Sequence, residues 1–286
     1  METWTVRSLL LWAREWLAKK GVDNPRLDAE LLLAKALHCD RIRLYVDGDK
    51  PLSAEELARF KPLVQRRGAR EPTAYILGVR EFYGRPFAVG PGVFIPRPET
   101  ELLVQLALEA MPRDGRVLDL CAGSGAVGVS IAAERPEAEV DLVELSPEAA
   151  AFARKNAESL APGRARVHEG DLFAALPGPA RYHAVVSNPP YVPLRDKPRL
   201  APELTGHEPA LALFSGDDDG LSVLRRLAQG APSWLLPGGL FAVEIDPPQA
   251  QAVSGLCAAA GLVRIKVQRD LAGLDRHVTA SLPEGA

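Results

Sequence analysis

The first 75 residues place apolar side chains at the three- and four-residue intervals of amphipathic helices. One such face is formed by six residues: Val6, Leu9, Leu10, Ala13, Trp16 and Leu17. A second helix is predicted to begin at Asn24-Pro25, because proline suits the first helical turn. A third is predicted at Ser53, since Ser53 and Glu56 have the spacing of a capping box. We therefore expect a small helical domain over residues 1–78.

Residues 79–97 follow a different pattern and are predicted to link two domains. Short apolar runs stand on either side of Gly90-Pro91-Gly92, which indicates a β-hairpin. Beyond this linker, Pro98 suits a first helical turn, and the acidic Glu99 and Glu101 complement the dipole of a helix N-terminus. An apolar helix is expected over residues 102–108.

From residue 112 onward, short apolar runs alternate with helical patterns. The predicted strands are 116–120, 139–144, 165–168, 183–187, 240–245, 263–267 and 278–282. The predicted helices are 126–134, 147–160, 220–230 and 247–260. Such alternation indicates a mainly parallel sheet covered by helices on both faces. Because ligands of open sheets bind beyond the carboxyl ends of the strands, we expect the site of this second domain, residues 98–286, directly after its strands.

The composition is that of a globular chain. Of the 286 residues, 47% are hydrophobic and 25% are charged, which excludes a disordered or collagen-like chain. No stretch approaches the roughly 18 apolar residues of a membrane span. The apolar run 9–12 is too short for a signal peptide, so a cytoplasmic protein is expected. The 3 cysteines and 5 histidines lack metal-ligand spacing, and no metal is expected.

Charge is unevenly distributed along the chain, although the net charge is only -3. Residues 1–80 carry 15 basic and 11 acidic side chains, and the remainder of the chain is acidic. The basic part is open to two interpretations. It fits contact with a nucleic acid or an acidic partner, and it equally fits an ordinary solvated helical surface.

A glycine-rich string, Asp119-Leu-Cys-Ala-Gly123-Ser-Gly125-Ala-Val-Gly128, follows the first strand predicted for the sheet. Its glycines allow a tight turn and the close approach of a ligand, and the helix that follows attracts an anionic group. By spacing alone the string fits a dinucleotide, with a nicotinamide cofactor as the default interpretation. Asp119 favours S-adenosylmethionine, because a carboxylate at the strand end can bind a cationic amino group. Glu144, which closes the second strand, can accept from ribose hydroxyls under either interpretation.

Asp171 and Leu172 follow the third strand predicted for the sheet. The Asp171 carboxylate is placed to accept a hydrogen bond from an adenine amino group, and Leu172 is placed to pack on the adenine ring. An alternative of equal weight is that Asp171 caps the N-terminus of the next helix.

The string Asn188-Pro189-Pro190-Tyr191 follows the buried strand 183–187 and carries the strongest chemical signal. Two prolines hold the backbone extended and leave its carbonyls free. The Asn188 side-chain carbonyl and the Pro189 backbone carbonyl can then accept both N–H groups of a planar amide or aromatic amine. This turns the delocalised nitrogen lone pair toward an electrophilic methyl group, while Tyr191 holds the flat group by stacking. An ordinary Asn-Pro turn is the alternative for the string in isolation.

These motifs resemble those of the release-factor glutamine methyltransferases of the HemK/PrmC type, and the resemblance covers nearly the whole chain. Its further strings are Arg70-Glu-Pro-Thr-Ala-Tyr-Ile-Leu-Gly78, Glu81-Phe-Tyr-Gly84, Phe94-Ile-Pro-Arg-Pro-Glu-Thr-Glu101, Glu208-Pro-Ala-Leu-Ala-Leu-Phe-Ser-Gly216 and Arg269-Asp-Leu-Ala-Gly-Leu-Asp-Arg276. The shorter motifs are shared by many methyltransferases, whereas Ile-Pro-Arg-Pro-Glu-Thr-Glu together with Asn-Pro-Pro-Tyr is specific.

The resemblance implies a class I S-adenosylmethionine-dependent methyltransferase domain, Rossmann-like with a mainly parallel seven-stranded sheet, behind a small N-terminal helical domain that binds the partner. The implied reaction methylates the side-chain amide nitrogen of the glutamine in the Gly-Gly-Gln motif of class 1 peptide-chain release factors. The implied cofactor site comprises Asp119, Cys121, Ala122, Gly123, Ser124, Gly125, Glu144, Asp171, Leu172 and Asn188. The glutamine would be held by Asn188, Pro189, Pro190 and Tyr191, with Asn188, Pro189 and Tyr191 as the catalytic residues.

Two other functions remain possible from the sequence. Methylation of an exocyclic base amine in DNA or RNA normally needs a basic groove, which a net negative chain does not favour, so nucleic acid is not expected as a partner. A non-catalytic binding module would have no need to keep the glycine loop, Glu144 and Asn188 together. A large macromolecular substrate favours a monomer.

One departure from the family pattern is Glu244-Ile-Asp-Pro-Pro-Gln249, where the family usually has Glu-x-Gly, so the contacts of this loop are not predicted from that pattern.

Overall fold

The computed structural model describes residues 4–178 and 181–285, and the chain divides into two compact units. The first unit comprises the described residues up to Val79 together with Ala201–His207. The second comprises Arg80–Leu200 and the described residues from Glu208 onward. The chain therefore leaves the second unit after the Asn-Pro-Pro-Tyr string, contributes one short segment to the first unit and returns. In the described part of the chain, no helix has both the length and the apolar character that a membrane span requires.

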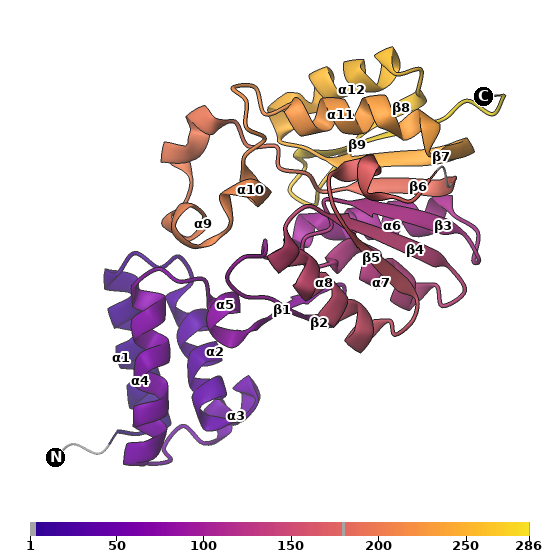
Figure 1. Ribbon diagram of the computed structural model, residues 1–286. Coiled ribbons are helices and arrows are strands. Elements are labelled where there is room, and N and C mark those ends of the chain that lie inside the picture. Colours follow the sequence, from indigo (N-terminus) through magenta and orange to yellow (C-terminus); the bar gives the residue numbers. More distant parts are fainter. Residues whose placement is uncertain (1–3, 179–180, 286) are drawn as a thin grey trace. The chain divides into compact units, whose positions relative to one another are not determined.

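The first unit is helical. Its three longest helices, α1 (Val6–Lys19), α2 (Pro25–Leu37) and α4 (Ala54–Gly68), lie side by side (Figure 1). Shorter helices are α3 (Arg41–Val46), α5 (Thr73–Leu77) and α9 (Pro202–His207). The apolar faces predicted from the sequence meet in one core, which includes Leu9, Leu17, Leu32, Leu33 and Phe60. The capping box at the start of α4 is confirmed, because the Glu56 amide donates to Ser53 Oγ at 3.1 Å and the Ser53 amide donates to Glu56 Oε2 at 2.8 Å.

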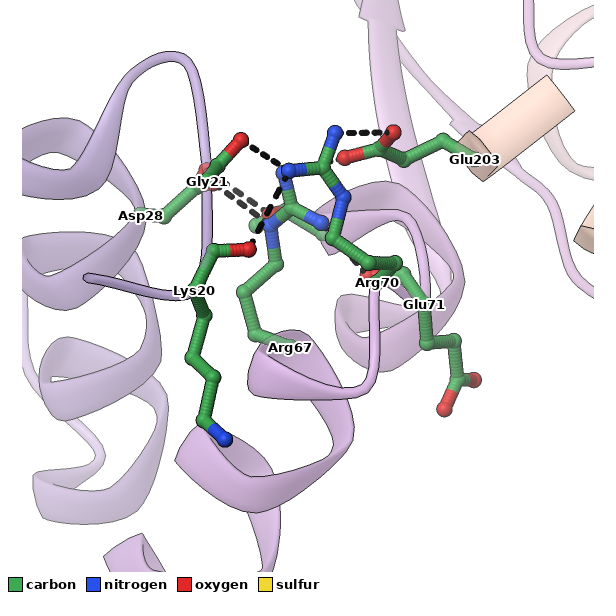
Figure 2. Close-up of polar contacts among 8 residues, drawn as sticks. Lys20, Gly21, Asp28, Arg67, Arg70, Glu71 and Glu203 are labelled. Atoms are coloured by element: carbon green, nitrogen blue, oxygen red, sulfur yellow. Dashed lines mark hydrogen bonds and ion pairs between the residues drawn. The ribbon is translucent and has the colours of Figure 1, made fainter. Parts of the chain in front are cut away.

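A network of charged side chains joins α2, α4 and α9 within this unit (Figure 2). The guanidinium of Arg67, which is 6% exposed, donates to Asp28 Oδ2 at 2.7 Å and to Glu203 Oε1 at 3.0 Å. Arg70 donates to the other oxygen of Glu203 at 2.6 Å, and Thr73 Oγ1 donates to Asp28 Oδ1 at 2.7 Å. Buried charges are tolerated only when they are paired and hydrogen-bonded, and here each carboxylate receives at least two donors.

The linker contains the predicted hairpin, but its turn is not at Gly90-Pro91-Gly92. Strands β1 (Val79–Phe82) and β2 (Arg85–Ala88) form a two-stranded sheet joined by Tyr83 and Gly84. Both residues have left-handed φ angles, 50° and 69°, which is the requirement of a two-residue hairpin turn whose twist matches its strands. Gly90-Pro91-Gly92 lies beyond β2, in a separate turn that the Val93 amide closes on the Gly90 carbonyl. The prediction of the turn position was wrong because Tyr83 gives no local signal for a left-handed conformation.

The second unit is built on a seven-stranded sheet of order β5-β4-β3-β6-β7-β9-β8. The strands are β3 (Arg116–Leu120), β4 (Glu139–Glu144), β5 (Ala165–Glu169), β6 (Tyr182–Ser187), β7 (Leu235–Glu244), β8 (Val263–Arg269) and β9 (Asp275–Ser281). Strands β3 to β7 pair in parallel, and β9 pairs antiparallel with both β7 and β8. The chain reverses its direction of winding at β3, so the carboxyl ends of β3, β4 and β6 lie at the edge where such sheets bind ligands.

Helices cover both faces of this sheet, and side chains alternate between the two faces as the two-residue period of a strand requires (Figure 1). One face packs against α6 (Glu101–Ala110), α7 (Ala126–Glu134) and α8 (Pro147–Leu160), with Val117, Ala184 and Ala242 in its core. The other face packs against α11 (Ser222–Gly230) and α12 (Ala250–Ala259), with Leu118, Val185 and Phe241 in its core. This arrangement confirms the predicted fold class.

Short elements complete the unit. They are the 3-10 helices η1 (Pro98–Thr100), η2 (Leu172–Ala175), η3 (Leu194–Arg199), η4 (Ala231–Ser233) and η5 (Pro247–Gln249) and the helix α10 (Ala210–Leu213). The sequence predicted helical turns at Pro98 and at residue 247 and offered a helix start after Asp171 as an alternative, but it did not predict the others. Strand β7 also begins at Leu235, five residues before the predicted strand. Elements of three to six residues show too few turns for an apolar period to be recognised.

Candidate active site

Three neighbouring strands bring the predicted site residues to one edge of the sheet. Leu120 at the end of β3 is in register with Val143 on β4 and with Ser187 on β6. Ser187 Oγ donates to the Leu120 carbonyl at 2.7 Å, and the Ala122 amide donates to the Val143 carbonyl at 3.0 Å. These bonds fix the starts of the glycine loop and of the Asn-Pro-Pro-Tyr string beside each other.

The glycine loop comprises residues 121–125 between β3 and α7, and it holds five of the predicted cofactor residues. It turns through left-handed φ angles at Cys121, Gly123 and Gly125, and a Cβ placed on Gly123 would meet nothing within 4 Å. The loop is closed from inside, because the Gly125 amide donates to the Ala122 carbonyl at 2.8 Å and the buried Ser124 offers its carbonyl to Asn156 at 2.9 Å. Gly123 therefore leaves open space on its outer side, where a ligand has room to approach.

Asp119 is 1% exposed and lies beneath this loop. Its Oδ2 accepts a hydrogen bond from the Gly128 amide in the first turn of α7, at 2.8 Å. Burial, and to a smaller degree the charge of Glu144, raises the pKa of Asp119 to about 7, against the lowering effect of the Gly128 amide. Its expected contact with a cationic amino group stays a prediction, and the chemistry fits, since a cation would stabilise the carboxylate that burial disfavours.

Glu144 ties the glycine loop to the start of α8. Its Oε2 accepts from the Gly123 amide at 2.7 Å, and its Oε1 accepts from the Ser146 amide at 2.8 Å. Burial raises the pKa of Glu144, and the two amides oppose that shift. Each carboxylate oxygen can accept a second hydrogen bond, so the predicted contact with ribose hydroxyls is compatible with both bonds.

Asp171 and Leu172 lie one strand further along, after β5. Asp171 occupies the N-cap position of η2, as the alternative expected, but its side chain makes no capping hydrogen bond and forms an ion pair with Arg226 at 2.7 Å. The Gly170 amide donates to the Glu144 carbonyl at 2.9 Å, which holds this turn against the end of β4. Leu172, with a left-handed φ of 47°, is buried against the core of the α11 and α12 face.

The Asn-Pro-Pro-Tyr string is held by two residues to which the sequence analysis gave no role, Thr100 and Glu244. Asn188 Nδ2 donates to Thr100 Oγ1 at 3.1 Å, and Thr100 Oγ1 donates to Glu244 Oε2 at 2.6 Å. The Tyr191 hydroxyl donates to Glu244 Oε1 at 3.1 Å. Burial and this carboxylate raise the pKa of Tyr191, so the phenol keeps its proton and remains a donor. Pro189 is buried between these two anchored residues, and Pro190 is half-buried.

The loop that departs from the family pattern also contacts this string. Gln249 Nε2 donates to the Tyr191 carbonyl at 2.9 Å and to the Gly220 carbonyl at 3.2 Å. Asp246-Pro-Pro-Gln249 forms a capped turn, in which the Asp246 amide donates to Gln249 Oε1 at 3.1 Å. The signal for these residues was present as Thr100 in the quoted Pro-Glu-Thr-Glu string and as Glu244 at a strand end.

The polar groups at this edge of the sheet fit S-adenosylmethionine. The buried carboxylate of Asp119 matches a cationic amino group, and that of Glu144 matches ribose hydroxyls. Asp171, after the next strand, matches an adenine amine, and the glycine loop leaves open space on its outer side. Among the residues that the structure describes, no three histidine, cysteine or acidic side chains form a group able to hold a metal ion. Burial raises the pKa of Cys121 to about 12, so its thiol stays protonated and is no nucleophile.

The fold and this site define a class I S-adenosylmethionine-dependent methyltransferase. The PrmC N-terminal domain model matches residues 8–78, and the methyltransferase small domain model matches residues 87–205. A "Release factor glutamine methyltransferase" of Geobacter sulfurreducens is 46% identical over 277 residues, which cover 97% of this chain and 96% of the relative. A protein of the same description from Cereibacter sphaeroides is 44% identical over 93% of this chain and 95% of its own. The chain belongs to the release factor glutamine methyltransferase family.

Two solved structures share the fold of this chain. A methyltransferase from Pyrococcus furiosus has a TM-score of 0.54 and 16% identity over 78% of this chain and 98% of its own. The 16S rRNA N2 G1207 methyltransferase of T. thermophilus, solved with AdoMet and guanosine, has a TM-score of 0.51 and 22% identity over 71% of this chain and 49% of its own. At these identities the likeness concerns the fold alone.

Proposed function

We propose that this protein transfers a methyl group from S-adenosylmethionine to the side-chain amide nitrogen of the glutamine in the Gly-Gly-Gln motif of class 1 peptide-chain release factors. The observation that carries the proposal is the anchored Asn188-Pro189 pair beside the glycine loop, in a chain of this family. A primary amide has two N–H donors, and the Asn188 side-chain carbonyl and the Pro189 backbone carbonyl provide two acceptors.

The chain contributes orientation rather than acid–base chemistry. S-adenosylmethionine, when bound, supplies a methyl group made electrophilic by the positive sulfur that carries it. Asn188 and Pro189 hold the amide so that its nitrogen lone pair leaves conjugation and points along the line of transfer. In the transfer the substrate nitrogen would bond to the methyl carbon as the carbon–sulfur bond breaks, S-adenosylhomocysteine would leave, and the positively charged nitrogen would then lose its proton to solvent. No general base is required before transfer, and we assign none.

The roles of the remaining site residues belong to the same proposal. Asp119 would bind the amino group of the cofactor, Glu144 its ribose hydroxyls and Asp171 its adenine amine. Cys121, Ala122, Gly123, Ser124, Gly125 and Leu172 would line the rest of the cofactor site. Tyr191, whose hydroxyl is held by Glu244, would present its ring to the flat amide, and Pro190 would keep the backbone of the string extended.

The proposal extends to the organisation of the chain. Residues 1–78 would bind the release factor, 79–97 would link the domains, and 98–286 would carry the reaction. We further propose a monomer that acts in the cytoplasm, where translation terminates, and that does not bind nucleic acid on its own. A release factor presents a folded protein surface besides its glutamine, and a separate helical unit provides a second place for contact.

The test is methyl transfer from labelled S-adenosylmethionine to three acceptors: a class 1 release factor, the same factor with its Gly-Gly-Gln glutamine replaced, and duplex DNA. The wild-type protein is expected to label only the intact factor. Asn188→Ala should abolish labelling, whereas Gln251→Ala, the loss of a side-chain amide at an exposed position of α12, should not. Label on the substituted factor or on DNA would overturn the assignment of the substrate, and DNA labelling would favour an exocyclic base amine.

A further inference from the structure

We propose that Thr100 and Glu244 are positioning residues that fix the orientation of the Asn188 amide, so that its carbonyl oxygen and not its NH2 group faces the substrate nitrogen. This inference rests on the proposed function, because the need for an acceptor at this place comes from the amide or amine to be methylated. It concerns three side chains from distant parts of the sequence that meet at one point, at separations of 88 and 144 residues.

The direction of these hydrogen bonds follows from the chemistry of Glu244, the last of the three side chains. A carboxylate accepts hydrogen bonds and donates none, so the Thr100 hydroxyl must give its proton to Glu244. The lone pairs of the Thr100 oxygen then face Asn188, which must present its NH2 group to them. Asn188 Oδ1 is thereby left pointing away from Thr100 and available to a substrate N–H.

The Tyr191 hydroxyl is a second donor to Glu244 and supports the same direction of hydrogen bonding. The Tyr191 hydroxyl donates to Oε1 of Glu244 while Thr100 donates to Oε2, so both oxygens of this carboxylate receive a proton donor from the site. Thr100 and Glu244 are 3% and 2% exposed, so water does not compete for these bonds. His277 Nε2 lies 3.6 Å from Glu244 Oε2, beyond hydrogen-bond distance.

Orientation matters because the two ends of a primary amide have opposite roles. An Asn188 side chain turned by 180° would present two N–H donors to the two N–H donors of a glutamine amide, and the acceptor needed for lone-pair alignment would be lost. The half-exposed Asn188 has no other side chain among its hydrogen-bond partners in the described residues to prevent this rotation. Thr100, held by Glu244, therefore acts on the reaction through Asn188 without touching the substrate.

The kinetic test compares Thr100→Val with Thr100→Ser. Valine keeps the shape and removes the hydroxyl, and we expect kcat to fall by about 100-fold while the KM for release factor and the Kd for cofactor change less than about threefold. Serine restores the hydroxyl and should keep most of the activity. Thr279→Val removes a buried threonine hydroxyl on β9, outside this site, and should leave kcat unchanged. An unchanged kcat in Thr100→Val, with a folded protein, would overturn the proposal.

A second measurement needs no substrate. The side-chain NH2 resonances of Asn188, assigned by their disappearance in Asn188→Ala, should exchange slowly with solvent in the wild type and in Thr100→Ser. In Thr100→Val they should exchange about tenfold faster or more. Equal exchange in all three proteins would overturn the orientation by Thr100, even if Thr100→Val were too unstable for kinetics. Failure of the wild type to methylate a release factor, with these resonances protected, would instead count against the proposed substrate and leave the orientation of Asn188 established.

Discussion

Arg67 on α4 forms an ion pair with Glu203 on α9 at 3.0 Å, and this contact ties the segment Ala201–His207, distant in sequence, to the helical unit. The same guanidinium holds Asp28 on α2 at 2.7 Å, so one buried cation pairs with two carboxylates, and Arg70 supplies the second positive charge at Glu203 (Figure 2). The segment that α9 belongs to begins at Ala201, about ten residues after Tyr191. Its next residue in the second unit, Glu208, is also anchored, by the Ile95 amide at 3.1 Å and by Arg97.

Replacing Arg67 with methionine should destabilise the helical unit by about 3–5 kcal/mol, because Asp28 and Glu203 would be left as buried charges that lack their main partner. The measurement is hydrogen exchange of the α2 and α4 amides under native conditions, which reads this unit separately. Arg7→Met is the control, since the Arg7–Asp49 pair is exposed and is expected to contribute at most about 1 kcal/mol. Equal effects of the two substitutions would contradict the assigned role of the network.

Gly128→Ala should displace the start of α7 and weaken cofactor binding. A Cβ at this position would lie 2.8 Å from Leu142 Cγ and 3.0 Å from Asp119 Oδ2, closer than side-chain carbons approach, so helix and strand must move apart. We expect a loss of about 1–3 kcal/mol in unfolding free energy, measured by urea denaturation, together with a higher cofactor Kd. Gly255→Ala on α12 meets nothing within 4 Å and should be neutral or stabilising by up to about 1 kcal/mol.

The architecture of the second unit was predictable because its central strands β3, β4 and β6 are largely buried and read as short, mainly apolar runs. The site residues at strand ends, such as Asn188 and Glu144, followed from the same pattern, since parallel strands deliver their carboxyl ends to one edge. The hairpin turn was not predictable. Tyrosine is common in strands, so nothing in the sequence marks Tyr83 as left-handed, whereas Gly90-Pro91-Gly92 has the residue types of a turn.

Thr100, Glu244 and Glu203 escaped prediction for a different reason. Each makes its defining contact with a residue at least 88 positions away, and a single polar side chain carries no periodic signal of such a partner. Local chemistry could place Glu244 at a strand end but could not show that Thr100 and Tyr191 would converge on it. Long-range hydrogen bonds of this kind depend on how complete helices and strands pack, and a sequence pattern of a few residues carries no information about that packing.

Asp171→Asn is predicted to reduce the preference of the site for an adenine amine. Wild-type protein should bind S-adenosylhomocysteine about three- to tenfold more tightly than its purine analogue without the amino group, the value of one half-exposed hydrogen bond to a charged acceptor. Asp171→Asn should lower this preference to about two- to threefold, because an amide oxygen still accepts the hydrogen bond but carries no charge, and Asp171→Ala should bind the two about equally, as measured by isothermal titration calorimetry. Arg226→Met, which removes the ion-pair partner of Asp171 at 2.7 Å, should retain the preference. A preference unchanged by Asp171→Asn would remove this residue from the cofactor site.

Cofactor binding should strengthen as pH rises through about 7, because the pKa of Asp119 is raised to about 7 and only its charged form attracts a cationic amino group. If only that form binds, the apparent Kd should fall about fivefold between pH 6 and 7. The free energy of unfolding depends on pH in the opposite direction. The folded chain holds this proton more tightly than the unfolded chain, so the contribution of Asp119 to stability declines from about pH 4 to 7. Asp119→Asn should remove both dependences, and a cofactor Kd that still falls fivefold in this variant would show that another group titrates.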